Sequence, residues 1–157
     1  MKRMICMRGV PGSGKSTKAK ELRDSFVRDG YQTSILSTDD WFMCDQVYMF
    51  EPKQISTAHA WNQARAKKLA GRGQPVIIID NTCMQLWEMR AYLEIAEQHQ
   101  YGFETYDVGS GDLEVCAVRN QHGVPLAAIQ KMAASYQPFQ DGISQIKGAR
   151  APWESGR

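Results

Sequence analysis

The sequence predicts an α/β fold in which a parallel sheet of four to five strands has helices on both faces and a helical lid. Apolar runs alternate with helix-favouring stretches, a glycine-rich loop directly follows the first apolar run, and residues 76–79 form a β-branched run without alternation. Such a run is typical of a parallel strand buried on both faces. With 157 residues, the chain is long enough for one domain with a buried core. We expect the core at about residues 2–136 and a tail at 137–157.

The first part of the chain reads as strand, loop, helix and strand. We expect a strand at residues 2–8 and a helix at 15–29, which ends at Gly30. Apolar residues within that helix recur at helical spacing and give it an inner face: Ala19, Leu22 and Phe26. A second strand follows at residues 33–37.

Residues 41–52 are rich in aromatic residues and methionine but lack a clean period, so we expect a mobile loop with a short helical turn. The elements after it alternate again: a helix at 53–70, a strand at 75–80, a helix at 86–99, a strand at 103–108, and helices at 112–120 and 125–136. Asp112 is a suitable cap for the first of these two final helices, and Pro125 is a suitable opening residue for the second.

The glycine-rich loop at residues 9–16 reads Gly-Val-Pro-Gly-Ser-Gly-Lys-Ser, between a strand and a helix. Its glycines permit backbone conformations that let successive N–H groups converge on phosphate oxygens at a helix N-terminus. Lys15 adds a positive charge and Ser16 an oxygen for Mg²⁺. The loop therefore predicts a P-loop NTPase fold that binds ATP, or GTP, with Mg²⁺; the alternative is a chance glycine-rich turn. The expected nucleotide-binding residues are Gly12, Ser13, Gly14, Lys15, Ser16 and Thr17.

Carboxylates follow two of the predicted strands. Because the carboxyl ends of parallel strands meet at one edge of the sheet, we expect these side chains to lie near the phosphate site. Asp39 is the candidate general base that takes a proton from a phosphoryl acceptor, and Asp40 is the alternative. Without the glycine-rich loop, the same pair would be read as a helix cap or a turn. Asp80 ends the β-branched strand, where a carboxylate can hold Mg²⁺ together with Ser16; it is otherwise a loop cap.

Arg119 lies near the end of a short predicted helix that precedes Gly123. From a lid, its guanidinium can grip donor phosphates bidentately and act in catalysis with Asp39 and Lys15. The alternative is a surface arginine that pairs with Asp112 or Glu114. Aromatic residues after the candidate base can stack on an unpaired nucleobase, although packing is the commoner use of such side chains: Trp41, Phe42, Tyr48 and Phe50.

Composition limits the class of protein. Charged residues make up 23% of the chain and no apolar run reaches membrane-spanning length, so we expect a cytoplasmic protein without a membrane partner. The net charge of +2 is well below that of a dedicated nucleic-acid binder. The cysteines and histidines show no metal-ligand spacing, which predicts reduced thiols and no structural metal.

These motifs resemble the polynucleotide-kinase-like branch of P-loop kinases, which includes the phage 5′-polynucleotide kinase and kinase domains linked to Smr-type nuclease domains. The resemblance covers about residues 4–136, and only its first motif is diagnostic of nucleotide binding in general. The motifs are residues 9–17, 37–42, 59–62, 78–82, 87–89 and 119–125. The resemblance implies that Asp39 orients the acceptor hydroxyl and that Arg119 contacts donor phosphates. It also implies Mg²⁺-dependent transfer of the γ-phosphoryl of ATP to a nucleic acid or nucleotide, first of all to a polynucleotide 5′-hydroxyl.

The chain departs from that family on the acceptor side. Phe42 stands where the phage enzyme has an arginine, His122 is the nearest counterpart of a second lid arginine, and Cys83 replaces an asparagine usual in the Smr-linked relatives. Related phage kinases act on 5-hydroxymethyluracil in DNA, which is the closest rival acceptor, and a free nucleoside is a further one. A non-catalytic nucleotide-binding switch module is the alternative of another class. An AAA-type motor is disfavoured because it needs a larger oligomerising domain and an arginine supplied in trans.

Overall fold

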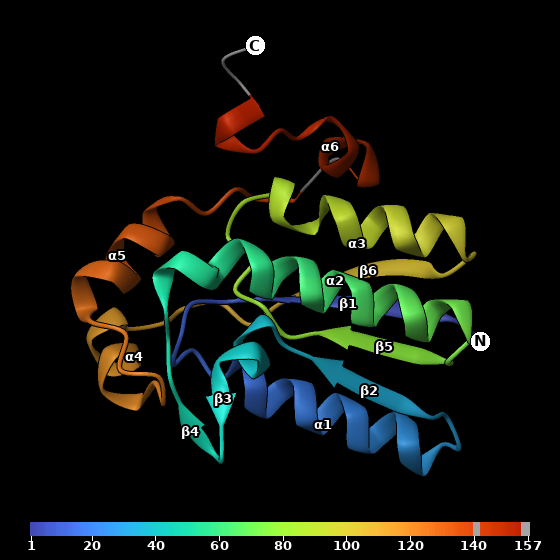
Figure 1. Cartoon of the computed structure of the whole chain (residues 1–157), viewed down its shortest axis with the longest axis horizontal. Helices are drawn as coiled ribbons and strands as arrows, with labels where there is room; N and C mark the ends of the chain where they lie inside the picture. The colour runs from blue at the N-terminus through green and yellow to red at the C-terminus, as the bar shows by residue number, and fades with distance from the viewer. Residues whose placement is uncertain (140–141, 155–157) are drawn as a thin grey trace.

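The computed structural model describes residues 1–139 and 142–154, and its centre is a four-stranded parallel sheet in the order β2-β5-β1-β6 (Figure 1). Its strands are β1 (Arg3–Arg8), β2 (Thr33–Leu36), β5 (Val76–Ile79) and β6 (Gly102–Asp107). The central strand β1 pairs with β5 on one side and with β6 on the other. The parallel sheet predicted from the sequence is confirmed, with four strands.

Helices cover both faces of this sheet (Figure 1). α1 (Lys15–Arg28) packs on one face, and α2 (Ile55–Gly71) and α3 (Trp87–Gln98) pack on the other. Every residue of β5 is fully buried, because alternate side chains enter the two opposite cores. The apolar run at residues 76–79 therefore lacks alternation for the reason predicted from the sequence, which is that helices cover both faces of the sheet.

Two further helices, α4 (Leu113–Arg119) and α5 (Leu126–Ala134), lie beyond the carboxyl edge of the sheet (Figure 1). With the connection between them they form what we call the lid segment, residues 113–134. It packs on the start of the glycine-rich loop through a third apolar cluster: Val10, Met84, Cys116 and Ile129. Asn120 fixes the connection, since its side-chain amide donates to the Val124 carbonyl at 3.0 Å and accepts from the Val124 N–H at 2.8 Å.

The segment after β2 is more ordered than the sequence predicts. A 3₁₀ turn at Thr38–Phe42 (η1) leads into an antiparallel hairpin of β3 (Met43–Cys44) and β4 (Val47–Tyr48). A second 3₁₀ turn, η2 (Pro52–Gln54), precedes α2. Strands of two residues are too short to show alternation. The hairpin turn is Asp45-Gln46, both with positive φ, in place of the usual Asn-Gly signal, so no recognisable turn pattern marks it in the sequence.

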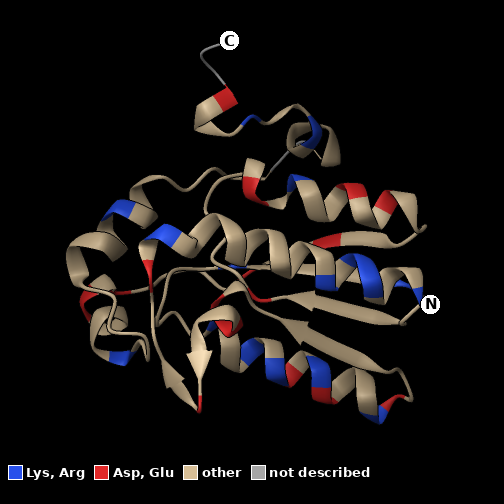
Figure 2. Ribbon diagram, in the orientation of Figure 1, with Lys and Arg blue, Asp and Glu red and all other residues tan. Residues whose placement is uncertain are grey.

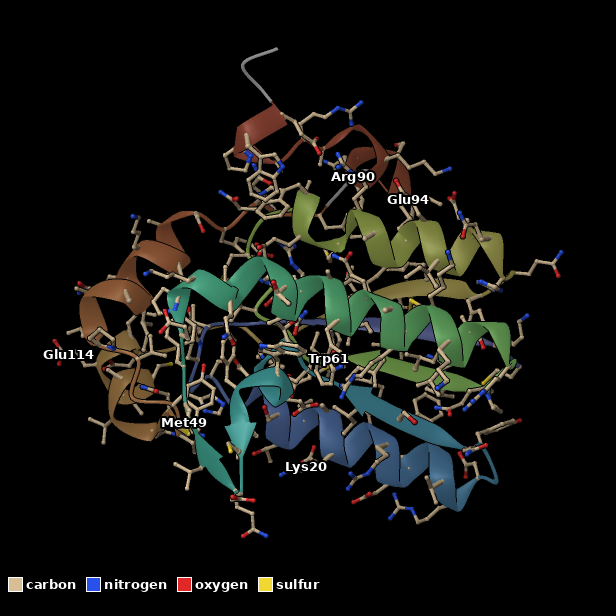
Figure 3. The ribbon with its side chains drawn as sticks, viewed as in Figure 1. Lys20, Met49, Trp61, Arg90, Glu94 and Glu114 are labelled. Carbon is tan, nitrogen blue, oxygen red and sulfur yellow. The ribbon has the colours of Figure 1, made fainter. Side chains whose placement is uncertain are left out.

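The expected tail also carries more structure than predicted. α6 (Ile143–Gly148) buries Ile146 against α3, and a 3₁₀ turn at Pro152–Glu154 (η3) follows it. Arg90 of α3 reaches toward this segment (Figure 3), donating to Glu154 at 2.6 and 2.9 Å and to the Ala149 carbonyl at 2.7 Å. A helix of six residues is too short for a clear helical period, which explains the difference.

The Arg90–Glu154 pair predicts that the docking of η3 weakens in acid. The hydrogen bonds from Arg90 lower the pKa of Glu154 from 4.5 to about 2. A carboxyl group with a depressed folded-state pKa stabilises the fold above its ordinary pKa, and the contribution is lost as the pH falls from 4.5 toward 2. Because Trp153 packs on Trp87 with 5.0 Å between ring centroids, its fluorescence reports the docking. We expect a transition in that pH range that Glu154→Gln lacks; identical titrations of the two proteins would contradict this.

Charged residues are spread over several helices, and α1 carries both signs along its length (Figure 2). Among the described residues, no helix has both the length and the apolar character needed to cross a bilayer.

Candidate functional site

The glycine-rich loop presents unpaired backbone donors at the N-terminus of α1. Gly12 and Gly14 have φ values of +81° and +93°, and no side chain caps the helix. Within residues 1–139 and 142–154, the N–H groups of Lys15, Ser16 and Thr17 have no hydrogen-bond acceptor. The Ser13 hydroxyl oxygen is buried without a partner in the same part of the chain. Uncapped N–H groups at a helix N-terminus attract anions, so this loop fits the phosphates of a nucleotide.

The absence of a side chain at Gly12 is needed for the close packing of the lid segment as well as for the conformation of the loop. A Cβ atom at this position would lie 2.1 Å from the carbonyl oxygen of Cys116 in α4. The absent side chain therefore lets the α4 backbone approach the phosphate loop closely. The sequence showed the glycine but not this neighbour, because the contact joins residues more than 100 positions apart.

Lys15, Ser16 and Asp80 form one polar cluster at the edge of the sheet. Lys15 Nζ lies 2.5 Å from Asp80 Oδ1, and the Ser16 hydroxyl donates to Asp80 Oδ2 at 2.8 Å. Both side chains of the ion pair are largely buried, at 11% and 8% exposure. A hydroxyl and a carboxylate oxygen are the hard ligands that Mg²⁺ prefers when it also binds phosphates and water. Ser16 and Asp80 thus offer the ligand types that Mg²⁺ prefers, beside the ammonium group of Lys15.

Arg119, at the end of α4, is exposed and lies beside the phosphate loop. One of its guanidinium nitrogens is 3.9 Å from the position that a Cβ atom on Gly14 would occupy. The alternative ion pair with Asp112 or Glu114 is not formed: in the described part of the chain Arg119 has no ion-pair partner, and Asp112 caps α4 at the Glu114 N–H. The guanidinium is therefore free to bind an anion held by the loop.

Asp39, in η1, is contacted from two elements distant in sequence. The Tyr48 hydroxyl of β4 donates to its Oδ1 at 3.1 Å, and His122 Nε2 from the lid segment lies 3.6 Å from its Oδ2. Partial burial, followed by the Asp39 charge, raises the pKa of Tyr48, so this hydroxyl remains a donor. The Asp39 side chain is still 47% exposed, which leaves it open to an acceptor.

Asp40 has different contacts. Its carboxylate completes a capping box with Ser37 at the start of η1 and forms an ion pair with Arg65 of α2 at 2.9 Å. The cap alternative considered from the sequence thus describes Asp40. Both side chains are 47% exposed, but Asp40 is engaged by a backbone N–H and a guanidinium, whereas Asp39 has no lysine or arginine partner among the described residues. This difference makes Asp39 the stronger candidate for a general base.

A buried polar network, which the sequence analysis missed, connects η1 to the end of β5. The Thr38 N–H donates to Asn81 Oδ1 at 2.9 Å, and the Asn62 and Asn81 amides both donate to the Tyr92 hydroxyl, at 2.9 and 3.4 Å. His59 lies 3.4 Å from the Thr38 hydroxyl, and burial lowers its pKa. The network fixes Asp39 relative to Asp80. The only signal in the sequence was that Asn62, His59 and Asn81 lie within motifs of the family resemblance.

The aromatic residues after Asp39 divide into core and surface. Phe42 is 4% exposed and is a packing residue, which is the commoner use of such side chains named in the sequence analysis. Phe50 is 49% exposed and stacks on Tyr48, with 6.3 Å between centroids and 12° between planes. Trp41 packs edge-on against Trp61 of α2, labelled in Figure 3. Phe50 and Trp41, 49% and 37% exposed, are the exposed members of this group, which we call the aromatic rim; Phe50 is linked to Asp39 through Tyr48.

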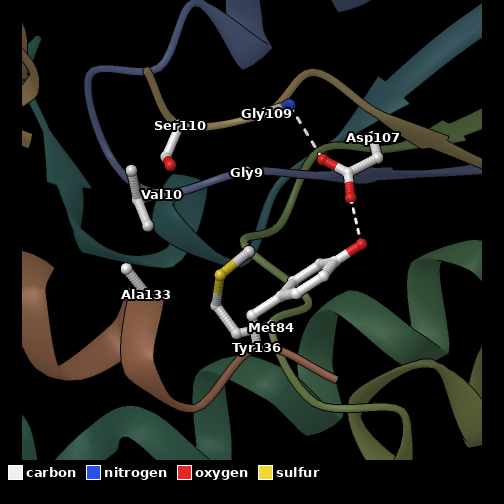
Figure 4. A pocket seen from close by; sticks show the side chains of 8 residues that line it. All are labelled: Gly9, Val10, Met84, Asp107, Gly109, Ser110, Ala133 and Tyr136. Carbon is white, nitrogen blue, oxygen red and sulfur yellow. Dashed lines mark hydrogen bonds between the residues drawn. The ribbon is translucent and has the colours of Figure 1, made fainter. Parts of the chain in front are cut away.

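A cavity of about 190 Å³ lies beneath the start of the loop (Figure 4). Its polar groups are paired with each other, since the Tyr136 hydroxyl donates to Asp107, whose other oxygen accepts from the Gly109 N–H. Behind it, the buried Arg8 lies over the Tyr136 ring and donates to the backbone carbonyls of Cys83, Met84 and Gln137. We interpret this region as the support that fixes the loop.

The chain is similar to parts of two larger curated proteins. It is 40% identical over 139 residues to human (Homo sapiens) NEDD4-binding protein 2, covering 87% of this chain and 8% of that protein. It is 30% identical over 155 residues to YLP motif-containing protein 1 of Rattus norvegicus, covering 85% of this chain and 11% of that protein. The chain therefore spans about a tenth of the length of these relatives.

Solved structures with similar folds are P-loop kinases and related enzymes. Kti12 of Chaetomium thermophilum in complex with ADP-AlF3 has a TM-score of 0.66 at 15% identity, over 86% of this chain and 80% of that one. APS kinase CysC of Mycobacterium tuberculosis with AMPPNP and APS has a TM-score of 0.58 at 16% identity, over 88% of this chain and 82% of that one. The Pnkp1/Rnl/Hen1 complex has a TM-score of 0.57 at 20% identity, over 75% of this chain and 38% of that one. At these identities the similarity shows the fold.

The family follows from the sequence match together with this fold. The family model described as "AAA domain" matches residues 4–139, which include the glycine-rich loop, the candidate base and the lid segment. The chain belongs to the AAA domain family and has a P-loop kinase-like fold.

Proposed function

We propose that this chain is a Mg²⁺-dependent kinase that transfers the γ-phosphoryl of ATP to a hydroxyl on a nucleic acid or nucleotide, with a polynucleotide 5′-hydroxyl as the first choice. The supporting observation is that the lid segment touches both halves of the site. Arg119 lies beside Gly14 and His122 lies beside Asp39. Three residues of chain span at most about 11 Å between Cα atoms, so one short connection carries both a donor-side arginine and an acceptor-side histidine, as an in-line transfer between the two halves requires.

The proposed reaction assigns one role to each group. Asp39 accepts the proton of the acceptor hydroxyl as its oxygen bonds to the γ-phosphorus, while the bond from that phosphorus to the β–γ bridging oxygen breaks and ADP leaves. The free N–H groups of the loop bind the phosphates, and Lys15 and Arg119 offset the negative charge that shifts to the leaving oxygen. Mg²⁺, held by Ser16 and Asp80, would supply further charge neutralisation at the phosphates.

The open acceptor side supports a nucleic-acid acceptor. Asp39 is half exposed, and the exposed Phe50 stacks on Tyr48, the residue that donates to Asp39; this arrangement suits a chain end whose terminal base stacks on an aromatic side chain. Arg119 acts in cis in this proposal, unlike the arginine supplied in trans that a motor ATPase requires. Cytoplasmic residence is part of the same proposal.

The test uses γ-labelled ATP with Mg²⁺ and a panel of acceptors: 5′-hydroxyl RNA, 5′-hydroxyl DNA, hydroxymethyluracil-containing DNA and free nucleosides. Label on 5′-hydroxyl oligonucleotides supports the first choice, and label only on hydroxymethyluracil or on free nucleosides supports the corresponding rival acceptor. Binding of ATP without a labelled product on any acceptor supports the non-catalytic switch module instead.

The substitution Phe50→Ala tests whether the aromatic rim binds the acceptor. We expect the KM for the oligonucleotide to rise about tenfold, because stacking of a base on an aromatic residue contributes on the order of 1–3 kcal/mol. The KM for ATP is expected to stay unchanged, and Phe50→Tyr, which keeps a ring, serves as the control. An unchanged oligonucleotide KM in Phe50→Ala would remove the rim from the acceptor site.

A further inference from the structure

His122 lies where the donor and acceptor halves of the site meet. It is in the connection between α4 and α5, three residues after Arg119. The side chain of Asn120 holds this connection through hydrogen bonds to the Ala117 and Val124 carbonyls and from the Val124 N–H. Arg119 and His122 are therefore presented together, and a movement of one carries the other.

The contacts of His122 are with acceptor-side residues. Its ring is tilted over Tyr48, with 4.0 Å between centroids and 35° between planes, while its Nε2 is 3.6 Å from Asp39 Oδ2. Its Nδ1 is buried and has no partner in the described part of the chain. Among these residues, Asp39 is thus the polar group that orients the imidazole, and a shift of about half an ångström brings Nε2 within hydrogen-bond distance.

We propose that His122 is a positioning residue that couples the lid segment to the candidate base. It holds one oxygen of Asp39 while Tyr48 holds the other, so that the carboxylate is fixed for the acceptor when Arg119 closes on the donor phosphates. This inference rests on the proposed function, since it names what orients the proposed base. Because coupling between sites is reciprocal, donor binding is expected to tighten acceptor binding, and the reverse.

Two substitutions separate the ring of His122 from its nitrogen. His122→Phe keeps a ring against Tyr48 but removes the Nε2 donor, whereas His122→Gln keeps an N–H donor of similar reach. We expect His122→Phe to lower kcat about tenfold with the KM for ATP nearly unchanged, as for the loss of a hydrogen bond to a charged group. His122→Gln is expected to recover most of this loss. The neighbouring exposed residue provides the control, Gln121→Ala, which is expected to behave as wild type.

The kinetic outcome can contradict the inference in two ways. A wild-type kcat in His122→Phe would show that the nitrogen does not position Asp39, and an equal loss in His122→Gln would show that the ring alone matters. In both cases the wild-type protein still phosphorylates the acceptor, so the proposed function would stand.

A second measurement does not depend on turnover, so it distinguishes failure of the proposed coupling from failure of the proposed function. In the wild-type protein, a non-hydrolysable ATP analogue with Mg²⁺ is expected to slow amide hydrogen exchange in the lid segment and also in the hairpin at residues 43–48. In His122→Ala the analogue is expected to slow exchange in the lid segment alone. Equal slowing of the hairpin in His122→Ala would overturn the coupling, whether or not any acceptor is phosphorylated.

Discussion

Asp39→Asn is expected to lower kcat for phosphoryl transfer by about 10³-fold while ATP binding stays nearly intact, because general base catalysis contributes roughly 10²–10⁴-fold. The amide keeps the size of the carboxylate and can still accept from Tyr48, but it cannot take a proton from the acceptor. Steady-state kinetics with labelled ATP, together with calorimetric binding of a non-hydrolysable ATP analogue, measure the two quantities separately.

The adjacent carboxylate provides the matched control. Asp40 accepts from the Ser37 N–H in the capping box and pairs with Arg65, and the amide oxygen of asparagine can still accept that N–H, so Asp40→Asn is expected to change kcat less than about threefold. A full rate in Asp39→Asn would remove Asp39 as the base, and a large loss in Asp40→Asn alone would move the role to Asp40.

Gly12→Ala is expected to produce the second large effect, a loss of both folding stability and nucleotide binding. The new Cβ atom would meet the Cys116 carbonyl at 2.1 Å, and the residue would keep a φ of +81°. Neither atom is at the end of a flexible side chain, so the loop and α4 must move apart. We expect the free energy of unfolding to fall by about 3 kcal/mol or more and the Kd for ATP to rise at least about tenfold.

Gly30→Ala isolates the backbone contribution to that effect. Gly30 has a φ of +90° at the end of α1, and nothing lies within 4 Å of the position of its Cβ atom. It is expected to lower the free energy of unfolding by only about 1–2 kcal/mol, without an effect on ATP binding. Denaturant unfolding and calorimetry measure both variants. Equal losses in the two would mean that contact with α4 is not what requires Gly12.

Local features of the sequence were sufficient to predict the sheet and the phosphate loop. The β-branched run at residues 76–79 needed no partner to be recognised, and the loop combined glycine, lysine and serine at fixed spacing. The rule that parallel strands end at one edge then placed Asp80 against Lys15, as found at 2.5 Å. The catalytic roles of Asp39, Lys15 and Arg119 remain predictions that the variants described above test.

The features that the sequence did not reveal are contacts between distant positions and strands of only two residues. His122 and Asp39 are 83 positions apart, and no local pattern indicates that the α4–α5 connection folds back onto η1. The hairpin pairs only Met43 with Tyr48 and Cys44 with Val47, too few residues to show a strand period. Both features depend on how separate elements pack, which local propensity does not determine.

The hairpin has one further consequence, for divergence between related chains. β3 and β4 pair only with each other and share no ladder with the main sheet in the described residues. Insertions or exchanges at the tip, around Asp45, therefore leave the register of β1, β2, β5 and β6 untouched. Under the proposed function, changes at a few hairpin positions are therefore a route to a different acceptor that leaves the phosphate loop intact.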